Sequence, residues 1–138
     1  MLPVLLYGSD TWTLRDALSK KLDAFGTKSL RYILGISWKE KVTNKKLLAR
    51  TRLEPVTTLI KRSQLGLFGH VARMADDQPP RRVLLAREGK DWRRPRGRAR
   101  VRWADQTIKE VRTLSTLSIA YRAARDRDKW RALVREAT

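Results

Sequence analysis

Positive charge is the feature that most constrains how this chain can fold. Its 138 residues include 32 Lys and Arg against 14 Asp and Glu, a formal net charge of +18. A folded chain must keep these cations at the surface, because an unpaired buried charge is very costly. Leu, Ile, Val and Phe still make up about a quarter of the sequence, above the roughly one-fifth that is typical of disordered chains. We therefore expect a folded domain with a modest core.

The composition excludes several classes of protein. There is no Cys, so disulfide frameworks, zinc fingers, iron–sulfur clusters and thiol nucleophiles are excluded, and one His cannot build a multi-histidine metal site. No apolar run approaches the roughly 18 residues of a membrane span. The apolar stretch Leu2 to Tyr7 lacks a basic leader and is shorter than a signal-peptide core. We expect a soluble, intracellular chain, nuclear or cytoplasmic and not secreted, without a membrane partner.

Apolar residues at helical spacing predict an all-α fold, a small bundle of about five helices with an extended Arg-rich segment. The first helix runs from about Leu14 to Leu34, after a capping pair of Thr13 and Asp16. The other predicted helices are 44–52 with Thr43 as its cap, 57–74, 103–114, and 118–138 with a break near Asp126. The apolar stretch 2–7 could be a strand or the end of a buried element, and 81–87 fits a strand or a helix.

The five tryptophans and two close glycines give further expectations. Trp103 and Trp130 fall on apolar helix faces and should belong to the core, together with inward positions such as Val111, Ile119 and Ala137. The tryptophans of connecting segments are freer to contact a ligand; they are Trp12, Trp38 and Trp92. Gly66 and Gly69 would let another backbone or a phosphate approach the third helix.

The segment 81–102, which we call the basic connector, carries the strongest functional signal. It holds ten basic and two acidic residues, so +8 of the +18 lies in 22 residues. Arginine occupies every second position from Arg94 to Arg102, and in an extended backbone these side chains form one row with a spacing of roughly 6.6 Å. Arginine binds phosphate through paired hydrogen bonds and stacks on bases. We therefore expect a polyanionic partner, most simply nucleic acid, against the alternatives of a solubilising linker or a membrane-surface segment.

Three other features have weaker interpretations. Pro95 to Ala99 resembles an AT-hook, but Ala99 stands where that motif has Pro. Asp76 and Asp77 superficially match the paired carboxylates of a two-metal polymerase site, yet they precede Pro79-Pro80 without a strand pattern, which favours a solvated loop. His70 could bind a phosphate or stack on a base, and the simpler interpretation is a helix-surface histidine. No nucleophile elbow and no phosphate-binding loop motif occurs.

A series of local strings occurs in a fixed order along nearly the whole chain. They are L-L-Y-G-S-D-T-W at 5–12, R-Y-I-L-G-I-S-W at 31–38, K-V-T-N at 41–44, L-G-L-F-G-H-V-A-R-M at 65–74, G-R-A-R-V-R-W at 97–103 and D-R-D-K-W-R at 126–131. Together they resemble the region after the palm in reverse transcriptases of LINE-type (non-LTR) retrotransposons. The chain departs from that family at 27–31, which lacks its arginine-rich face and Cys, and at Ala99, where the family usually has Pro.

The resemblance implies a thumb-like helical region at 1–80, the basic connector at 81–102 and a C-terminal helical region at 103–138. It implies no catalytic residue and no cofactor in this chain, because the palm carboxylates and their Mg²⁺ would belong to an upstream domain. The implied partner is RNA, DNA or RNA–DNA hybrid, with the rest of a reverse transcriptase polypeptide as a further partner. A DNA-tethering module and a degenerate retroelement remnant stay open as alternatives.

The candidate nucleic-acid-binding residues are mostly cations of the connector and of the third helix. They are Arg93, Arg94, Arg96, Arg98, Arg100, Arg102, Lys61, Arg62, Arg73, Arg81, Arg82 and His70.

Overall fold

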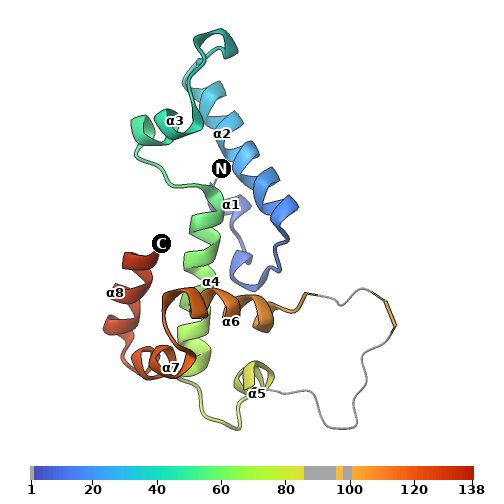
Figure 1. The fold of residues 1–138 in the computed structure, drawn as a ribbon, viewed down its shortest axis with the longest axis vertical. Coiled ribbons are helices and arrows are strands. Elements are labelled where there is room, and N and C mark those ends of the chain that lie inside the picture. Colours follow the sequence, from blue (N-terminus) through green and yellow to red (C-terminus); the bar gives the residue numbers. More distant parts are fainter. Residues whose placement is uncertain (1, 86–95, 98–100) are drawn as a thin grey trace. The chain divides into compact units, whose positions relative to one another are not determined.

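The structure, a computed structural model, describes residues 2–85, 96–97 and 101–138 (Figure 1). In this part of the chain the fold is all-α, as predicted, with eight α-helices, two short 3-10 helices and no strand. The elements are α1 Leu2–Leu5, η1 Ser9–Thr11, α2 Asp16–Ile33, η2 Trp38–Glu40, α3 Asn44–Thr51, α4 Val56–Ala72, α5 Pro79–Leu85, α6 Trp103–Leu114, α7 Leu117–Arg125 and α8 Arg127–Ala137. Among these helices, none has the length and apolar character needed to cross a membrane.

The helix count exceeds the expected five for local reasons. The two segments without a clear prediction, at 2–7 and 81–87, contribute the short helices α1 and α5. The last predicted helix divides at Asp126, as expected, because its carboxylate caps α8 by accepting from the backbone N–H groups of Asp128 (3.0 Å) and Lys129 (3.2 Å). The hydrogen bond from Lys129, followed by that from Asp128, holds the pKa of Asp126 below its usual value.

The chain forms two compact units, and the boundary between them falls within α4. Unit 1 comprises residues 1–13 and 62–138, and unit 2 comprises residues 14–61. The sequence predicts a different division, into the regions 1–80, 81–102 and 103–138. That division concerns composition and function rather than packing, and it remains a prediction.

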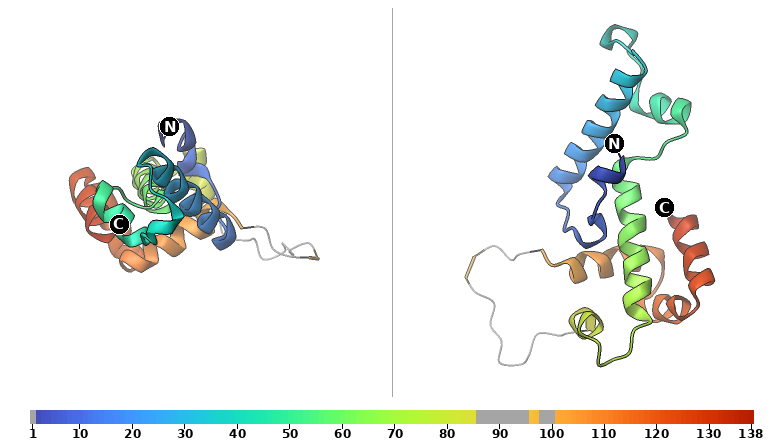
Figure 2. Two further views of the ribbon diagram at one scale, coloured as in Figure 1. Left: turned by 90° about the horizontal axis from the view of Figure 1, so that it is seen from above. Right: turned by 180° about the vertical axis from the view of Figure 1, so that it is seen from behind.

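The core of unit 1 is built by α6, α7 and α8 around the last turns of α4 (Figures 1 and 2). Its largest buried apolar residues are Leu65, Phe68, Val71, Leu84, Val111, Trp130 and Val134. Two residues predicted to face inward do not, since Ile119 is 54% exposed and Ala137 is exposed. The small Ala120 and Ala124 form the row of α7 that packs on the core, so the neighbouring row with Ile119 faces solvent.

Trp130 of α8 belongs to the core, as the apolar pattern predicts, and it packs directly against α4. Its indole N–H donates to the carbonyl of Leu65 at 2.8 Å, and its ring lies 5.4 Å from that of Phe68 between centroids. The ring occupies the space that a side chain at Gly69 would need. Trp130 therefore fills the space beside Gly69, where we expected another backbone or a phosphate to approach. A buried indole is stable there because its N–H has a hydrogen-bond acceptor.

The N-terminal segment is tied into unit 1 by two hydrogen bonds to its backbone. Trp103 donates its indole N–H to the carbonyl of Asp10 at 2.7 Å, and the amide of Gln64 donates to the carbonyl of Trp12 at 2.7 Å. Trp12 is therefore half-buried and held in place, rather than free in a connecting segment.

Unit 2 is a helical hairpin in which α3 lies alongside the C-terminal half of α2 (Figures 1 and 2). Thr43 caps α3 as predicted, accepting from the N–H of Lys46 at 3.3 Å. The predicted cap of α2 is wrong: the helix begins at Asp16 with Arg15 at the N-cap and without a side-chain cap. Asp23 of α2 accepts the backbone N–H of Thr57 at 3.0 Å and its hydroxyl at 2.8 Å, which fixes the first turn of α4.

We predict opposite effects of alanine at the two glycines of α4. Gly69→Ala should lower the free energy of unfolding by about 1–3 kcal/mol, because the added methyl overlaps the Trp130 ring. Gly66→Ala should raise it by about 0.5–1 kcal/mol, because the site is open and alanine favours a helix. Urea unfolding followed by circular dichroism measures both, and equal effects would contradict the packing of Trp130.

Candidate nucleic-acid interface

The basic connector is only partly described by the structure. Arg93, Arg94, Arg98 and Arg100 lie outside the described residues. Arg96 is exposed. Arg102, at the N-cap of α6, is exposed and pairs with Asp105 at 3.9 Å. The described part of the site is therefore α5, which contains the first residues of the connector, and α6, which follows the connector.

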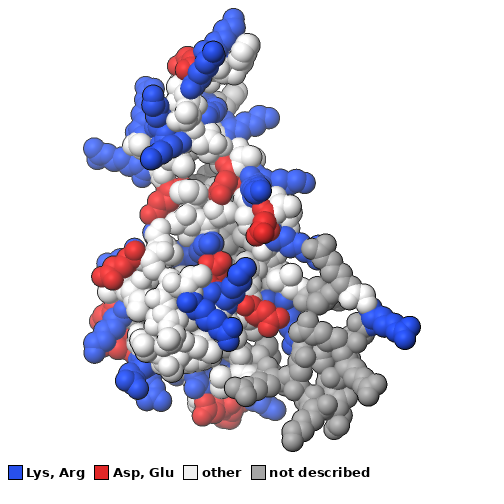
Figure 3. Space-filling model, viewed as in Figure 1, with Lys and Arg blue, Asp and Glu red and all other residues white. Residues whose placement is uncertain are grey.

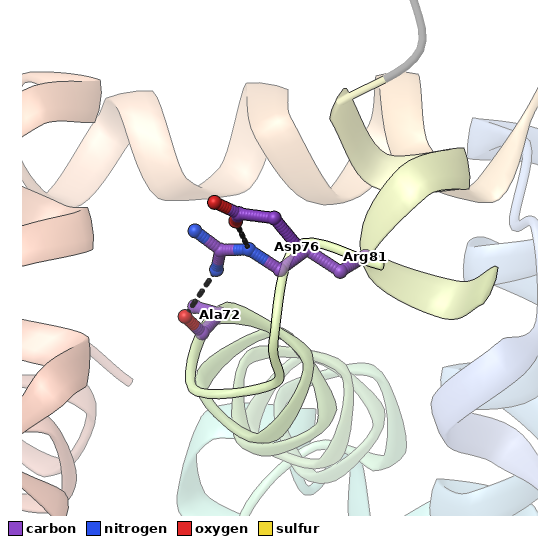
Figure 4. A network of polar contacts seen from close by, with 3 residues as sticks. All are labelled: Ala72, Asp76 and Arg81. Atoms are coloured by element: carbon purple, nitrogen blue, oxygen red, sulfur yellow. Dashed lines mark hydrogen bonds and ion pairs between the residues drawn. The ribbon is translucent and has the colours of Figure 1, made fainter. Parts of the chain in front are cut away.

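α5 is fixed to the end of α4 by Arg81 (Figure 4). The guanidinium of Arg81 donates to the carboxylate of Asp76 at 2.5 Å and to the carbonyl of Ala72 in the last turn of α4. Burial raises the pKa of Tyr121, and the nearby positive charge of Arg81 opposes that rise. Leu84 of α5 is buried in the core. One end of the connector therefore starts from a fixed helix.

α6 is fixed to the same unit at the other end of the connector. Trp103, its first residue, donates to the carbonyl of Asp10. Thr107 is almost completely buried, and so is Val111, as predicted. The connector therefore begins and ends on helices that belong to the core of unit 1.

The other predicted cations divide into two groups. Arg73 donates to the carbonyl of Ala124 at 2.8 Å, and Arg62 donates to the hydroxyl of Thr138 at 3.1 Å, so both are used inside unit 1. The remaining predicted residues, Lys61, Arg82 and His70, are exposed. Lys61 ends unit 2, whereas the other predicted residues in the described part belong to unit 1.

The structure also shows a cationic surface that the sequence reasoning missed. Residues 28–52, which we call the unit 2 tip, carry eight Lys and Arg and one acidic residue. Figure 3 shows blue side chains gathered over α3 and the C-terminal part of α2, with little red among them. Trp38 and Tyr32 on this tip are 82% and 89% exposed. A charge count over a sliding window could have found it, because eight basic residues in 25 exceed the average of 32 in 138 for the whole chain.

The acidic residues offer no comparable site in the described part of the chain. No group of three or more His, Asp or Glu side chains there could hold a metal ion. Asp76 and Asp77 are exposed in the loop after α4, as expected, and Asp76 pairs with Arg81.

Comparison with known proteins yields one relative among the curated proteins. The chain is 29% identical over 148 aligned residues to a Caenorhabditis elegans protein that is named as transposon-derived and uncharacterized. The match covers 100% of this chain and 52% of the relative, so the chain spans about half the length of that protein. No family model matches the chain, and no solved structure matches it. The similarity indicates a transposon-related origin.

We predict that Arg81 and its neighbour Arg82 differ sharply in their effect on stability. Arg81→Ala should lower the free energy of unfolding by about 1–3 kcal/mol, because it leaves the Ala72 carbonyl and Asp76 without their donor. Arg82→Ala, at an exposed position, should stay within about 0.5 kcal/mol of the unchanged chain. Urea titrations of both variants measure the difference, and similar values would remove the anchoring role of Arg81.

Proposed function

We propose that this chain is a non-catalytic, nucleic-acid-binding part of a retrotransposon reverse transcriptase, from the region that follows the palm. Its ligand is RNA or an RNA–DNA primer–template duplex. The chemistry of DNA synthesis, with its metal ions, belongs to a palm domain elsewhere in the longer polypeptide.

The observation that carries this proposal is the local charge of the basic connector between two anchored helices. Ten basic residues and two acidic ones lie between positions 81 and 102. Arg81 holds the α5 side and Trp103 holds the α6 side to unit 1. A binding segment whose two ends are held loses less conformational entropy when it aligns on a phosphate backbone.

Two further facts support the type of polypeptide. The ordered strings resemble LINE-type reverse transcriptases, and the relative in C. elegans is named as transposon-derived. The relative is about twice as long as the match, which leaves room for other domains in such a protein.

The phosphate-binding groups in this proposal are the six connector arginines from Arg93 to Arg102. The further binding groups in this proposal are Arg62, Arg73, Arg81, Arg82 and His70 of unit 1 and, separately, Lys61 of unit 2. Arg73 and Arg81 make internal hydrogen bonds, and a guanidinium has five N–H donors, so their contribution is chiefly through charge.

We predict that the connector arginines set the salt dependence of duplex binding. The variant changes all six to Gln: Arg93, Arg94, Arg96, Arg98, Arg100 and Arg102. Each phosphate contact contributes a log–log slope of roughly −0.9 on duplex DNA, so their loss should flatten the slope by as much as about five. Fluorescence anisotropy with labelled RNA–DNA hybrid, RNA duplex and DNA duplex, over a range of salt, measures this.

The matched control removes the same charge from the exposed arginines of the last three helices. It changes Arg112, Arg122, Arg125, Arg127, Arg131 and Arg135 to Gln. The control should keep most of the slope. Salt-independent binding by the unchanged chain, or an equal loss in both variants, would contradict the proposal.

The same measurements address the two alternatives. A DNA-tethering module would prefer A·T-rich DNA duplex over RNA and hybrid. A degenerate remnant would show neither cooperative unfolding nor selective binding.

A further inference from the structure

The unit 2 tip, residues 28–52, combines positive charge with exposed aromatic side chains. Its basic residues are Lys28, Arg31, Lys39, Lys41, Lys45, Lys46, Arg50 and Arg52. Its one acidic residue, Glu40, accepts the backbone N–H of Ser37 at 2.7 Å in a capping box. The single carboxylate is therefore engaged in closing a turn, and the rest of the tip presents cations.

The turn that carries Trp38 is fixed by local hydrogen bonds. Gly35, with a φ of 64°, ends α2 in the left-handed conformation, and the N–H of Ile36 donates to the carbonyl of Arg31 at 3.0 Å. The Ser37–Glu40 capping box then begins η2, whose first residue is Trp38. These contacts fix the backbone that carries the indole.

Arg31 fastens this turn to α3. One guanidinium nitrogen donates to the carbonyl of Val42 at 2.8 Å and to the side chain of Asn44 at 2.7 Å. The loop between η2 and α3 is therefore held against α2, and Lys45 and Lys46 in the first turn of α3 are held with it. In the first turn of a helix, acidic side chains are stabilising and basic ones are not. Helix stability therefore does not explain why Lys45 and Lys46 occur there.

Packing does not account for the aromatic residues either. Tyr32 is 89% exposed, Ile33 71% and Trp38 82%, all within seven residues of one another. A cluster of large apolar groups on a fixed, solvent-facing turn is typical of a binding surface. Lys39 directly follows Trp38, and Lys28 and Arg31 precede Tyr32 on α2.

We propose that the unit 2 tip binds single-stranded nucleic acid, with bases stacked on Trp38 and Tyr32 and phosphates on the surrounding lysines. Cations with almost no acidic residue select a polyanion. Exposed aromatic faces favour a nucleic acid whose bases are unstacked, because a duplex keeps the faces of its bases inside the stack. This proposal concerns a different unit from the basic connector and does not depend on it.

The experiment uses the full chain with the six connector arginines changed to Gln, so that remaining binding reports on the tip. The probes are a labelled oligouridylate RNA, the corresponding oligothymidylate DNA and a mixed-sequence duplex, followed by anisotropy. In this background the single strands should bind more tightly than the duplex. Trp38→Ala and Tyr32→Ala should each weaken single-strand binding roughly 5- to 100-fold, the range for the loss of one stacked base.

Tyr7→Ala is the matched aromatic control. Tyr7 is 87% exposed, almost the same as Tyr32, but residues 1–13 contain no Lys or Arg. This change should leave single-strand binding within about twofold, since surface substitutions away from a site have small effects. Circular dichroism of each variant verifies that the helices remain folded.

The lysines have their own control. Changing Lys39, Lys45 and Lys46 to Gln should flatten the single-strand salt slope by about two, at roughly −0.7 per phosphate. Changing the exposed Lys109, Arg112 and Arg122 to Gln removes the same charge and should leave the slope nearly unchanged.

Several outcomes would overturn the proposal. They are loss of single-strand binding in the connector-altered background, tighter binding of the duplex there, an equal effect of Tyr7→Ala, or Trp38-dependent binding to anionic lipid vesicles without binding to the oligonucleotides. The outcomes for single-strand binding, Tyr7→Ala and lipid vesicles do not depend on whether the connector arginines set duplex binding, so on these measurements each proposal can fail while the other stands.

Discussion

The contact between Trp130 and the glycine face of α4 is the interaction on which unit 1 depends. The indole N–H satisfies a second lone pair on a buried carbonyl, and the ring fills the space beside Gly69, so α8 is held at close range. Phe68 then packs on both Trp130 and Tyr121, at 5.4 and 5.2 Å between ring centroids. This aromatic cluster brings α7 to α4, where Arg73 can reach Ala124. These large side chains stabilise unit 1 through the apolar area that they remove from water.

Part of the positive charge stabilises the fold itself. Arg81 donates to a carbonyl at the C-terminal end of α4, and Arg73 donates to one at the C-terminal end of α7. Helix C-termini expose unsatisfied carbonyls and the negative end of the macrodipole. A guanidinium there donates hydrogen bonds to the carbonyls and is also attracted by the macrodipole. The net charge of +18 therefore overstates the number of cations fully available to a polyanion. Arg73 and Arg81 are half-buried, whereas neighbours such as Arg82 are exposed.

The helices could be predicted from the sequence wherever a local signal marks their ends. Thr43 before α3 and Asp126 before α8 accept hydrogen bonds from backbone N–H groups within their own turn. The sequence alone is therefore enough to predict where these helices begin. Contacts that join distant segments could not be predicted this way. Gly69 accommodates a tryptophan 61 positions later, and the indole of Trp103 reaches back to Asp10. The tip was missed for another reason: a charge count would have shown its cations, but the exposure of Tyr32 and Trp38 beside them depends on how the hairpin packs.

The connector and the tip differ in the chemistry of their cations. The connector has nine arginines and one lysine, whereas the tip has five lysines and three arginines, one of which fastens the hairpin. A guanidinium is a rigid fork that matches a phosphate in fixed geometry, and the regular backbone of a duplex repeats that geometry. An ammonium on a flexible stem tolerates phosphates at varying positions, which suits a single strand whose shape changes. In the proposed single-strand site, the exposed aromatic faces rather than the cations would provide the recognition. The composition of the two surfaces therefore agrees with the two proposed ligands, a duplex for the connector and a single strand for the tip.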